Sequence, residues 1–437
     1  MRKIVSRSVA LAVILVLANA QASFAAVSWG AQRAIPGNYA WNYSNSLEYT
    51  GTPGAASFKL HEAYVSDASL PEAVKYTSSS NGIDWSTPKK VSGAQHAEGS
   101  SLGTAGTTVI VGWFTGYSSY DDSDVPRRLQ VNISTNSGGT WSGVQNLTSG
   151  TGQVDYPIVA AATTSAGPTN VYAAWVDSKT CDVKFKQSSN GGATWSGNVI
   201  IGATTAHLQG TAYGCSGYTN IAAVRDLIAV SYVSNDTGTL KVARINLMGD
   251  ASRATNAANW TTSTLTDKIS LAQNGFPINS ASPQNTGVVT VAYNTATAQR
   301  YVRVTASAVS SPTTIYTNGT IAGEVYTGGY STVVEPAPSG GYVAMWAGCR
   351  DVGIANPCNY GSAKAKFDLL SATSANGTSW STPTQVQLSA TGQQLNDEPS
   401  LVVVPGTGGV RVYAQYNVYR STYSYYDVWM RIGNGSL

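Results

Sequence analysis

Short apolar runs that end near an aromatic residue recur along the chain. Runs such as KLHEAYV (59–65), VYAAWV (171–176) and YVAMWA (342–347) follow small residues and precede an alternating run such as RRLQVNIS (127–134). Period-two alternation predicts strands, and short apolar runs bounded by Gly, Asn and Ser predict buried strands. The aromatic position of the run occurs seven times, at Tyr64, Trp113, Trp175, Tyr232, Tyr293, Trp346 and Tyr416.

A second aromatic position repeats in the same units at intervals of 54 to 65 residues, at Trp29, Trp85, Trp141, Trp195, Trp260, Tyr316 and Trp380. Each unit therefore holds four strand-like runs. A lone four-stranded sheet leaves two faces and two edges uncovered, whereas sheets packed radially cover one another's faces. We predict an all-β fold, a seven-bladed β-propeller with four-stranded blades.

The two ends of the chain complement each other in this scheme. The last unit, from Gln393 to Leu437, has three strands, and the segment VSWGAQRAI (27–35) resembles the missing fourth. We expect the N-terminal strand to close the last blade. The predicted domain spans 26–437, with blades at 38–94, 95–149, 150–203, 204–267, 268–320, 321–390, and 391–437 plus 27–37.

Residues 1–25 have the pattern of a signal peptide. Arg2, Lys3 and Arg7 precede an apolar stretch at 9–18 that is shorter than the roughly 20 residues of a membrane span. We expect a secreted, extracellular protein without a membrane span. Without these three bases, 23 basic residues balance 23 acidic ones, so the charge favours no nucleic-acid partner. The sequence leaves the oligomeric state open.

The four cysteines fit an oxidising compartment. Cys349 and Cys358 lie nine residues apart in one loop-like stretch, which leaves Cys181 and Cys215 as the second predicted disulfide pair. Zinc binding is the alternative, but the chain has no Cys-x-x-Cys motif and contains only three histidines. No cofactor is predicted. Asp121, Asp122 and Asp124 could bind Ca²⁺, although a solvated acidic turn is the competing interpretation.

One phrase, Ser-x-Asn-x-Gly-x-Thr-Trp-Ser-Gly, occurs at 134–143 and again at 188–197. It resembles the Asp-box, or BNR repeat, of sialidase-like propellers, with Asn136 and Asn190 at the Asp position. Weaker copies precede Trp85, with Ser80 at that position, and Trp380, where Gly377 also persists. The resemblance implies a structural turn on the face opposite the active site. Sialidases, however, have six blades, and their Arg-Ile-Pro motif has only a near-miss here, at 33–36.

Functional side chains are therefore expected on the other face, in loops that enter each first strand or join the second and third strands. Carboxylates there could act as acid, base or nucleophile in glycoside cleavage, while the alternative is that they cap strand ends. The catalytic candidates are Glu98, Asp155, Glu324, Tyr326, Tyr330 and Glu398. Other polar residues of these loops are Asn45, His96, Tyr213, Tyr218, Asn274 and Asp397.

The loop VYRSTYSYYD (418–427) is rich in tyrosine, whose ring can pack on a sugar while its hydroxyl stays hydrated. Packing around a large loop is the alternative. The substrate-binding candidates are Tyr156, Arg350, Arg420, Tyr423, Tyr425 and Tyr426. We expect a secreted carbohydrate-interacting propeller that recognises a glycan or polysaccharide. A sialidase-like glycoside hydrolase or polysaccharide lyase is the first alternative, and a protein-binding platform is the second.

Overall fold

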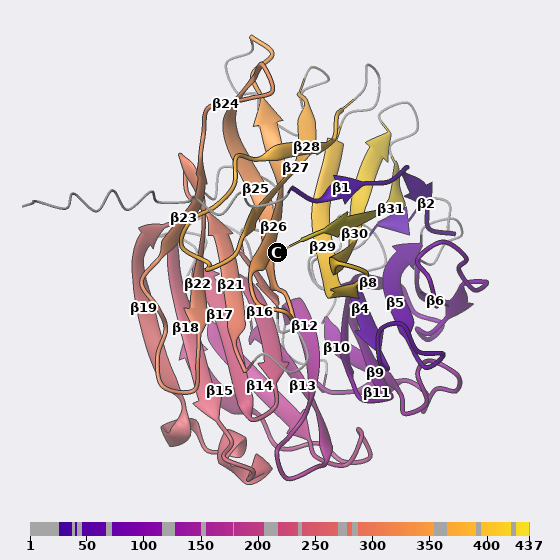
Figure 1. The fold of residues 1–437 in the computed structure, drawn as a ribbon. Helices are drawn as coiled ribbons and strands as arrows, with labels where there is room; N and C mark the ends of the chain where they lie inside the picture. The colour runs from indigo at the N-terminus through magenta and orange to yellow at the C-terminus, as the bar shows by residue number, and fades with distance from the viewer. Residues whose placement is uncertain are drawn as a thin grey trace, which may run out of the picture.

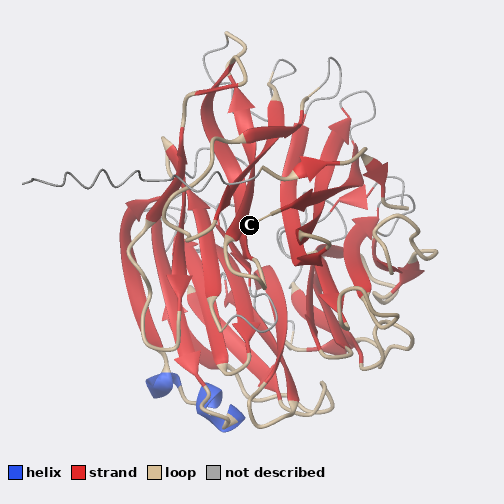
Figure 2. Cartoon of the chain, viewed as in Figure 1, coloured by secondary structure: helices blue, strands red, loops and turns tan. Residues whose placement is uncertain are grey.

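The structure is a computed structural model with strands arranged as blades around a centre (Figure 1). It describes residues 26–36, 40–41, 46–66, 72–115, 127–149, 154–177, 179–204, 217–234, 238–269, 278–281, 287–353, 365–389, 395–420 and 425–436. The predicted signal peptide lies outside these residues. The predicted fold is confirmed, since the described chain has almost no helix and its strands form seven four-stranded blades (Figure 2).

The first four blades follow one another along the chain. Each is a sheet of consecutive antiparallel strands, whose first strand contacts the first strand of the neighbouring blade. The strands are β4 (Leu47–Thr50), β5 (Lys59–Ser66), β6 (Ala73–Ser79) and β7 (Lys89–Lys90); β8 (Ala97–Ala105), β9 (Thr108–Thr115), β10 (Arg128–Ser134) and β11 (Gln145–Asn146); β12 (Val154–Thr163), β13 (Thr169–Asp177), β14 (Asp182–Ser188) and β15 (Val199–Ala203); and β16 (Gly217–Val224), β17 (Leu227–Ser234), β18 (Thr239–Asn246) and β19 (Thr261–Lys268).

The fifth and sixth blades repeat this order, with β20 (Ile278–Ala281), β21 (Val289–Asn294), β22 (Ala298–Val304) and β23 (Thr313–Thr317), then β25 (Glu324–Pro336), β26 (Tyr342–Arg350), β27 (Phe367–Ser374) and β28 (Thr384–Gln387). Short strands β3 (Ala40–Trp41) and β24 (Thr320–Ile321) pair with β5 and β25. One parallel bridge, from Phe367 to Leu395, joins the sixth blade to the seventh.

The seventh blade contains both ends of the propeller. β29 (Leu395–Gly406), β30 (Gly409–Arg420) and β31 (Tyr425–Gly435) supply three strands. The fourth position is filled by β1 (Ser28–Trp29) and β2 (Arg33–Ala34), which pair with β31 through Trp29↔Gly433 and Ala34↔Trp429. The predicted closure by the N-terminal strand is therefore consistent with the observed sheet.

The Asp-box phrases form the turns between the third and fourth strands. In the second blade Gly138 N donates to Ser134 Oγ at 2.9 Å and Thr140 N donates to Asn136 Oδ1 at 2.8 Å. The third blade repeats this geometry at Ser188 and Asn190. Asn replaces Asp without loss of the turn because its carbonyl oxygen accepts the same backbone N–H.

The two weaker copies need a correction to their alignment. In the first blade Asn81, and not Ser80, takes the Asp role, accepting from Asp84 N at 2.8 Å. In the sixth blade Asn376 accepts from Ser379 N at 2.9 Å, while Gly377 N donates to Ser374 Oγ. Both turns are one residue shorter than the full phrase, so matching at fixed spacing missed their polar residues.

The blades are held together by apolar clusters that span neighbouring sheets. The second-strand aromatics predicted from the repeat are buried, with Trp113, Trp175 and Trp346 at most 1% exposed. The box tryptophans are partly buried and pack against the preceding blade, as Trp141 does against the cluster of the first two blades. The fourth blade has no box. Two 3₁₀ helices, Ala251–Thr255 and Ala257–Asn259, precede its Trp260 instead (Figure 2).

No helix in the described part of the chain has the length and apolar character needed to cross a bilayer.

Candidate functional site at the channel mouth

One backbone irregularity recurs at the first residues of the innermost strands. In β8, Glu98 pairs with Phe114 and Ser101 pairs with Gly112. Between these two pairs β8 therefore has one residue more than its partner strand β9. The same one-residue bulge lies between Asp155 and Ile158 in β12, between Tyr330 and Val333 in β25, and between Asp397 and Ser400 in β29. Bulges redirect side chains and end regular pairing. Four blades thus present catalytic candidates or their neighbours on bulges at the mouth of the central channel.

The bulges hold residues in the left-handed backbone region. Gly99 has a φ of 63°, Ser331 of 51° and Glu398 of 48°. This conformation is unfavourable for a residue other than glycine, and such strain is found most often at functional sites. At Glu398 the strained backbone carries a carboxylate, to which Asn417 Nδ2 donates at 2.7 Å.

Three titratable side chains meet at the mouth between the first two blades. His96 Nε2 contacts Glu72 Oε2 and lies 3.7 Å from Glu98 Oε1. The nearest donor atoms of the three side chains all lie within 4.8 Å of one another. The exposed fractions of Glu72, His96 and Glu98 are 21%, 14% and 15%, so solvent reaches the group without surrounding it. We call these three residues the mouth cluster.

The backbone fixes the parts of the mouth cluster relative to each other. Glu72 immediately precedes β6 in the first blade, and Ala97 N donates to its carbonyl oxygen at 3.2 Å. In the second blade the Thr115 hydroxyl donates to the carbonyl oxygen of His96. The bulge that begins at Glu98 sets the direction of its side chain. The sequence separates Glu72 from His96 by more than 20 residues, and the contact between blades brings them together.

The surroundings shift the protonation of this group. Burial, reinforced by the negative charge of Glu72, raises the pKa of Glu98 to about 7, against an opposing effect of Arg127. Burial also lowers the pKa of His96, which favours the neutral imidazole. The Arg127 guanidinium lies 5.2 Å from the centre of the Phe114 ring, a cation–π arrangement beside the cluster.

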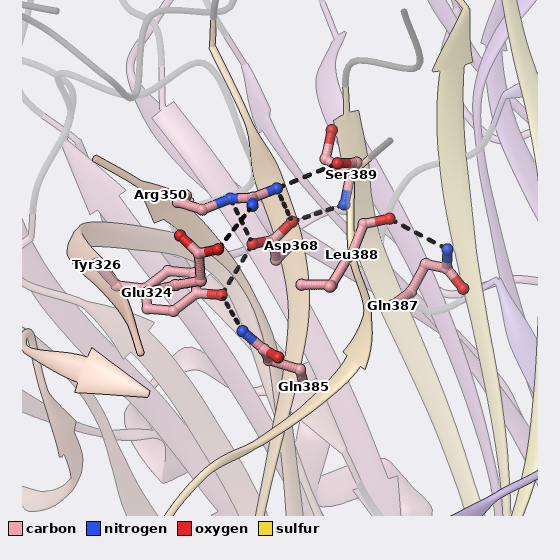
Figure 3. A network of polar contacts seen from close by, with 8 residues as sticks. All are labelled: Glu324, Tyr326, Arg350, Asp368, Gln385, Gln387, Leu388 and Ser389. Carbon is pink, nitrogen blue, oxygen red and sulfur yellow. Dashed lines mark hydrogen bonds and ion pairs between the residues drawn. The ribbon is translucent and has the colours of Figure 1, made fainter. Parts of the chain in front are cut away.

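A second polar group lies in the sixth blade, where three catalytic and substrate-binding candidates meet (Figure 3). Arg350 Nη1 donates to Glu324 Oε1 at 3.3 Å and Nη2 to Asp368 Oδ1 at 3.2 Å. The Tyr326 hydroxyl donates to Asp368 Oδ2 at 2.8 Å. Ser389 adds its backbone N–H to Asp368 and its carbonyl oxygen to Arg350.

This blade-six network is largely closed to solvent. Asp368 is fully buried, Tyr326 is 1% exposed, and the Arg350 side chain is 15% exposed. Glu324 is the accessible member, with 42% of its side chain exposed. The network therefore ties the sixth blade together through Arg350. Tyr330, 1% exposed, packs edge-on against Phe367 with 4.9 Å between ring centres.

The remaining sequence candidates lie wholly or partly outside the described residues. The strands that carry Asp155, Tyr156, Arg420, Tyr425 and Tyr426 are described, but their side chains are not. Asp121, Asp122, Asp124 and Tyr423 lie outside altogether. Cys181 and Cys349 have no free thiol, and their predicted partners Cys215 and Cys358 lie outside the described residues, so both pairings stay predictions.

Two further carboxyls, Glu48 and Glu335, were not among the predicted candidates and lie on innermost strands near the Asp-box side. Thr104 Oγ1 donates to Glu48 Oε2 at 3.3 Å, and burial raises the pKa of Glu48 to about 8. Burial and the charge of Glu48 raise the pKa of Glu335 well above its ordinary value. A cavity of about 430 Å³ lies on this side, lined in part by Tyr49, Pro336 and Pro405.

Sequence reasoning also missed Glu72 and Asp368. Glu72 lies in a loop that joins the second and third strands, so a full survey of those loops could have included it. Asp368 is the second residue of β27, and only its burial beside Arg350 reveals its role.

Comparison with known proteins gives a likeness of fold. No family model matches the sequence, and no curated protein matches it. A Dyadobacter fermentans protein of unknown function is 11% identical over 94% of this chain and 99% of that chain, with a TM-score of 0.47. An ulvan lyase, a polysaccharide lyase, is 11% identical over 91% and 95%, with a TM-score of 0.45. The NanB sialidase from Streptococcus pneumoniae is 9% identical over 94% of this chain and 98% of that chain, with a TM-score of 0.45.

With identities of 9–11% and TM-scores below 0.5, these likenesses carry no argument about function, which has to be argued from the site.

Proposed function

We propose that the protein is a secreted, carbohydrate-interacting Asp-box propeller that binds a glycan across the channel mouth. The observation that carries the proposal is the mouth cluster of Glu72, His96 and Glu98, fixed by backbone contacts between two blades. Charged groups that accept and donate hydrogen bonds, placed in a partly exposed mouth, suit the hydroxyl groups of a sugar.

Secretion and two disulfides belong to the same proposal. Expression of the full chain with residues 1–25 in a bacterial host, followed by N-terminal sequencing of the exported protein, tests cleavage near Ala25. Peptide mass mapping without reduction tests the pairs Cys181–Cys215 and Cys349–Cys358. A retained leader or free thiols in the exported protein would contradict these parts separately.

The binding test uses residues 26–437 and a panel of immobilised polysaccharides that includes neutral, uronate-containing and sialylated members. We expect retention on at least one member, reduced at least about tenfold by Glu98→Gln. Asp250→Asn is the matched control, because Asp250 caps a 3₁₀ helix in the turn between β18 and β19, on the Asp-box face. Loss of retention in both variants, or no retention of the unaltered protein on any polysaccharide, would refute binding at the mouth.

Cleavage of the bound glycan is the second candidate, and one distance favours it. The nearest oxygens of Glu72 and Glu98 lie within 4.8 Å of each other. Closely spaced carboxyl pairs, roughly 5–5.5 Å apart, serve retaining glycosidases, in which one carboxyl donates a proton and the other attacks the sugar. The same incubations are followed for new reducing ends and for the ultraviolet absorbance of unsaturated uronates. Retention without either product supports recognition alone.

A protein-binding platform gains no comparable support. Such a role calls for a contiguous apolar patch. In the described part of the chain the exposed large apolar side chains Ile83, Val144, Ile200 and Met248 come from four different blades, and Val325, Val352 and Leu388 belong to the sixth blade.

A further inference from the structure

The mouth cluster has a composition that neither glycan binding nor acid–base chemistry requires. One imidazole nitrogen and two carboxylate oxygens, from Glu72, His96 and Glu98, converge on one point from two blades. Imidazole nitrogen and carboxylate oxygen are among the common zinc ligands, and zinc sites with three protein ligands leave one position open. We propose that these three side chains bind one Zn²⁺ ion at the channel mouth.

The distances fit such an ion. Zinc lies about 2.0–2.2 Å from nitrogen and oxygen ligands, so the donor atoms of a tetrahedral site are roughly 3.4 Å apart. His96 Nε2 is 3.7 Å from Glu98 Oε1, and all three donor atoms lie within 4.8 Å. His96 Nε2 and Glu72 Oε2 are in direct contact. Small rotations of these side chains, without movement of the strands, would bring the three donors to ligand distance.

The charges also fit. Two carboxylates held this close together repel each other, and their side chains are at most 21% exposed, so water screens the repulsion incompletely. Arg127 places one positive charge near Glu98, and a divalent cation would offset the repulsion that remains. Calcium is disfavoured, because it takes six to eight oxygen ligands, and the cluster supplies a nitrogen and two carboxylates.

The scaffold is built before any ion arrives. The hydrogen bond from Ala97 N to Glu72 O joins the two blades at the cluster, and the Thr115 hydroxyl fixes the backbone of His96. A site whose ligands are already positioned loses little conformational freedom on binding. The open fourth position would face the mouth, where water or a sugar hydroxyl can enter.

The test measures zinc binding directly. Untagged protein covering 26–437 is stripped with EDTA, dialysed, and titrated with Zn²⁺, Mn²⁺ and Ca²⁺ by calorimetry, with metal content checked by elemental analysis. We expect one Zn²⁺ per chain, weaker binding of Mn²⁺, no binding of Ca²⁺, and a rise in unfolding temperature with added Zn²⁺. Failure of the unaltered protein to bind Zn²⁺ at one equivalent would overturn the proposal.

Variants locate the ion. His96→Gln and Glu98→Gln should each weaken Zn²⁺ binding at least tenfold, whereas Asp250→Asn should leave it unchanged. If His96→Gln, Glu98→Gln and Asp250→Asn all bind Zn²⁺ with the same affinity, the ion lies elsewhere and the proposal is overturned. If a ligand variant does not fold, Glu72→Gln replaces it. Residue 72 lies in the loop before β6 and outside the bulge, so this substitution should disturb the fold least.

The outcome is independent of the glycan proposal. Polysaccharide retention by stripped protein, compared with zinc-loaded protein, shows whether glycan binding persists when the ion is absent. Glycan binding without zinc binding refutes the metal site alone, and zinc binding without glycan binding refutes the proposed function alone.

Discussion

Gly138 lies directly against the hydroxyl group of Tyr76 in the neighbouring blade, so that a Cβ added to the glycine would be 1.9 Å from the phenol oxygen. The same tyrosine ring meets Trp141 edge-on, with 4.9 Å between ring centres, and its hydroxyl lies 2.6 Å from His61 Nδ1. The Asp-box of the second blade is therefore a contact between blades as well as a turn. Gly377 repeats the relationship, because its Cβ would lie 2.5 Å from the Tyr301 hydroxyl.

Gly138→Ala should destabilise the protein strongly for two reasons. The residue has a φ of 78°, which strains any side chain, and the added carbon overlaps Tyr76, which is buried and held by His61. We expect the free energy of unfolding to fall by about 2–4 kcal/mol, measured by denaturant titration.

Gly143→Ala is the matched control for this substitution. Gly143 has a φ of 94°, but no atom lies within 4 Å of its added Cβ. It should cost only the backbone strain, about 1 kcal/mol. If the free energy of unfolding falls by the same amount in Gly138→Ala and Gly143→Ala, the contact with Tyr76 contributes nothing.

Closure of the last blade gives a second prediction. Ile35 is 2% exposed, donates its N–H to the Val428 carbonyl at 3.0 Å, and packs in a cluster with Met430. Ile35→Ala should lower the free energy of unfolding by about 2–4 kcal/mol through lost burial and a cavity.

Hydrogen exchange should localise this effect. The amides of β31 that pair with the N-terminal strand should exchange faster in Ile35→Ala, whereas β9 should change little. Arg33→Ala, at an exposed position of the same segment, should change stability by no more than about 0.5 kcal/mol. A normal exchange pattern in Ile35→Ala would mean that the closing strand adds little to the propeller.

Arg350 provides a third prediction, which separates a structural role from a substrate-binding one. Its guanidinium is the cation beside Asp368, which is fully buried (Figure 3). Arg350→Met should cost about 3–5 kcal/mol because an uncompensated carboxylate remains in the interior. The double variant Arg350→Met with Asp368→Leu should recover part of that loss. Normal stability of Arg350→Met with reduced glycan retention would instead assign Arg350 to the ligand.

The sequence predicted the parts of the structure that repeat. Strand alternation and two aromatic registers sufficed for the blades, because every blade buries the same positions against its neighbours. In the weaker box before Trp380 the role of Asn376 escaped notice, because the turn needs an acceptor at a suitable place in space and a shorter loop supplies it at a different spacing.

The site was harder to predict because its contacts join different blades. Glu98 and His96 stood out as polar residues before an apolar strand. Glu72 lies in a loop between the second and third strands of its blade, but its position beside them depends on the packing of two sheets. The sequence assigned Arg350, Glu324 and Tyr326 to loops of one face, whereas the burial of Arg350 against Asp368 depends on a third strand. Burial of a polar group is a property of the assembled blades.

The carboxyl of Glu48, a partly buried side chain on β4, gives the last prediction, a dependence of stability on pH. Its pKa is raised from 4.5 to about 8 in the folded protein, chiefly by burial, so the folded state binds more protons than the unfolded chain between these values. Stability must therefore fall as pH rises through this window, by up to about 1.4 kcal/mol per pH unit for one group.

Glu48→Gln removes the group that titrates while keeping an acceptor for the Thr104 hydroxyl. Denaturant titrations at about pH 5, 6.5 and 8 should show a flatter profile for this variant than for the unaltered protein, with the largest gain in stability at about pH 8. Glu335→Gln should act in the same direction, since burial and Glu48 raise its pKa too. Asp250→Asn is the control, because Asp250 is remote from the channel and its pKa is lowered by hydrogen bonds from Ser252. If Glu48→Gln keeps the original slope between about pH 5 and 8, Glu48 is ionised in the folded channel and the proposed burial of its neutral form is wrong.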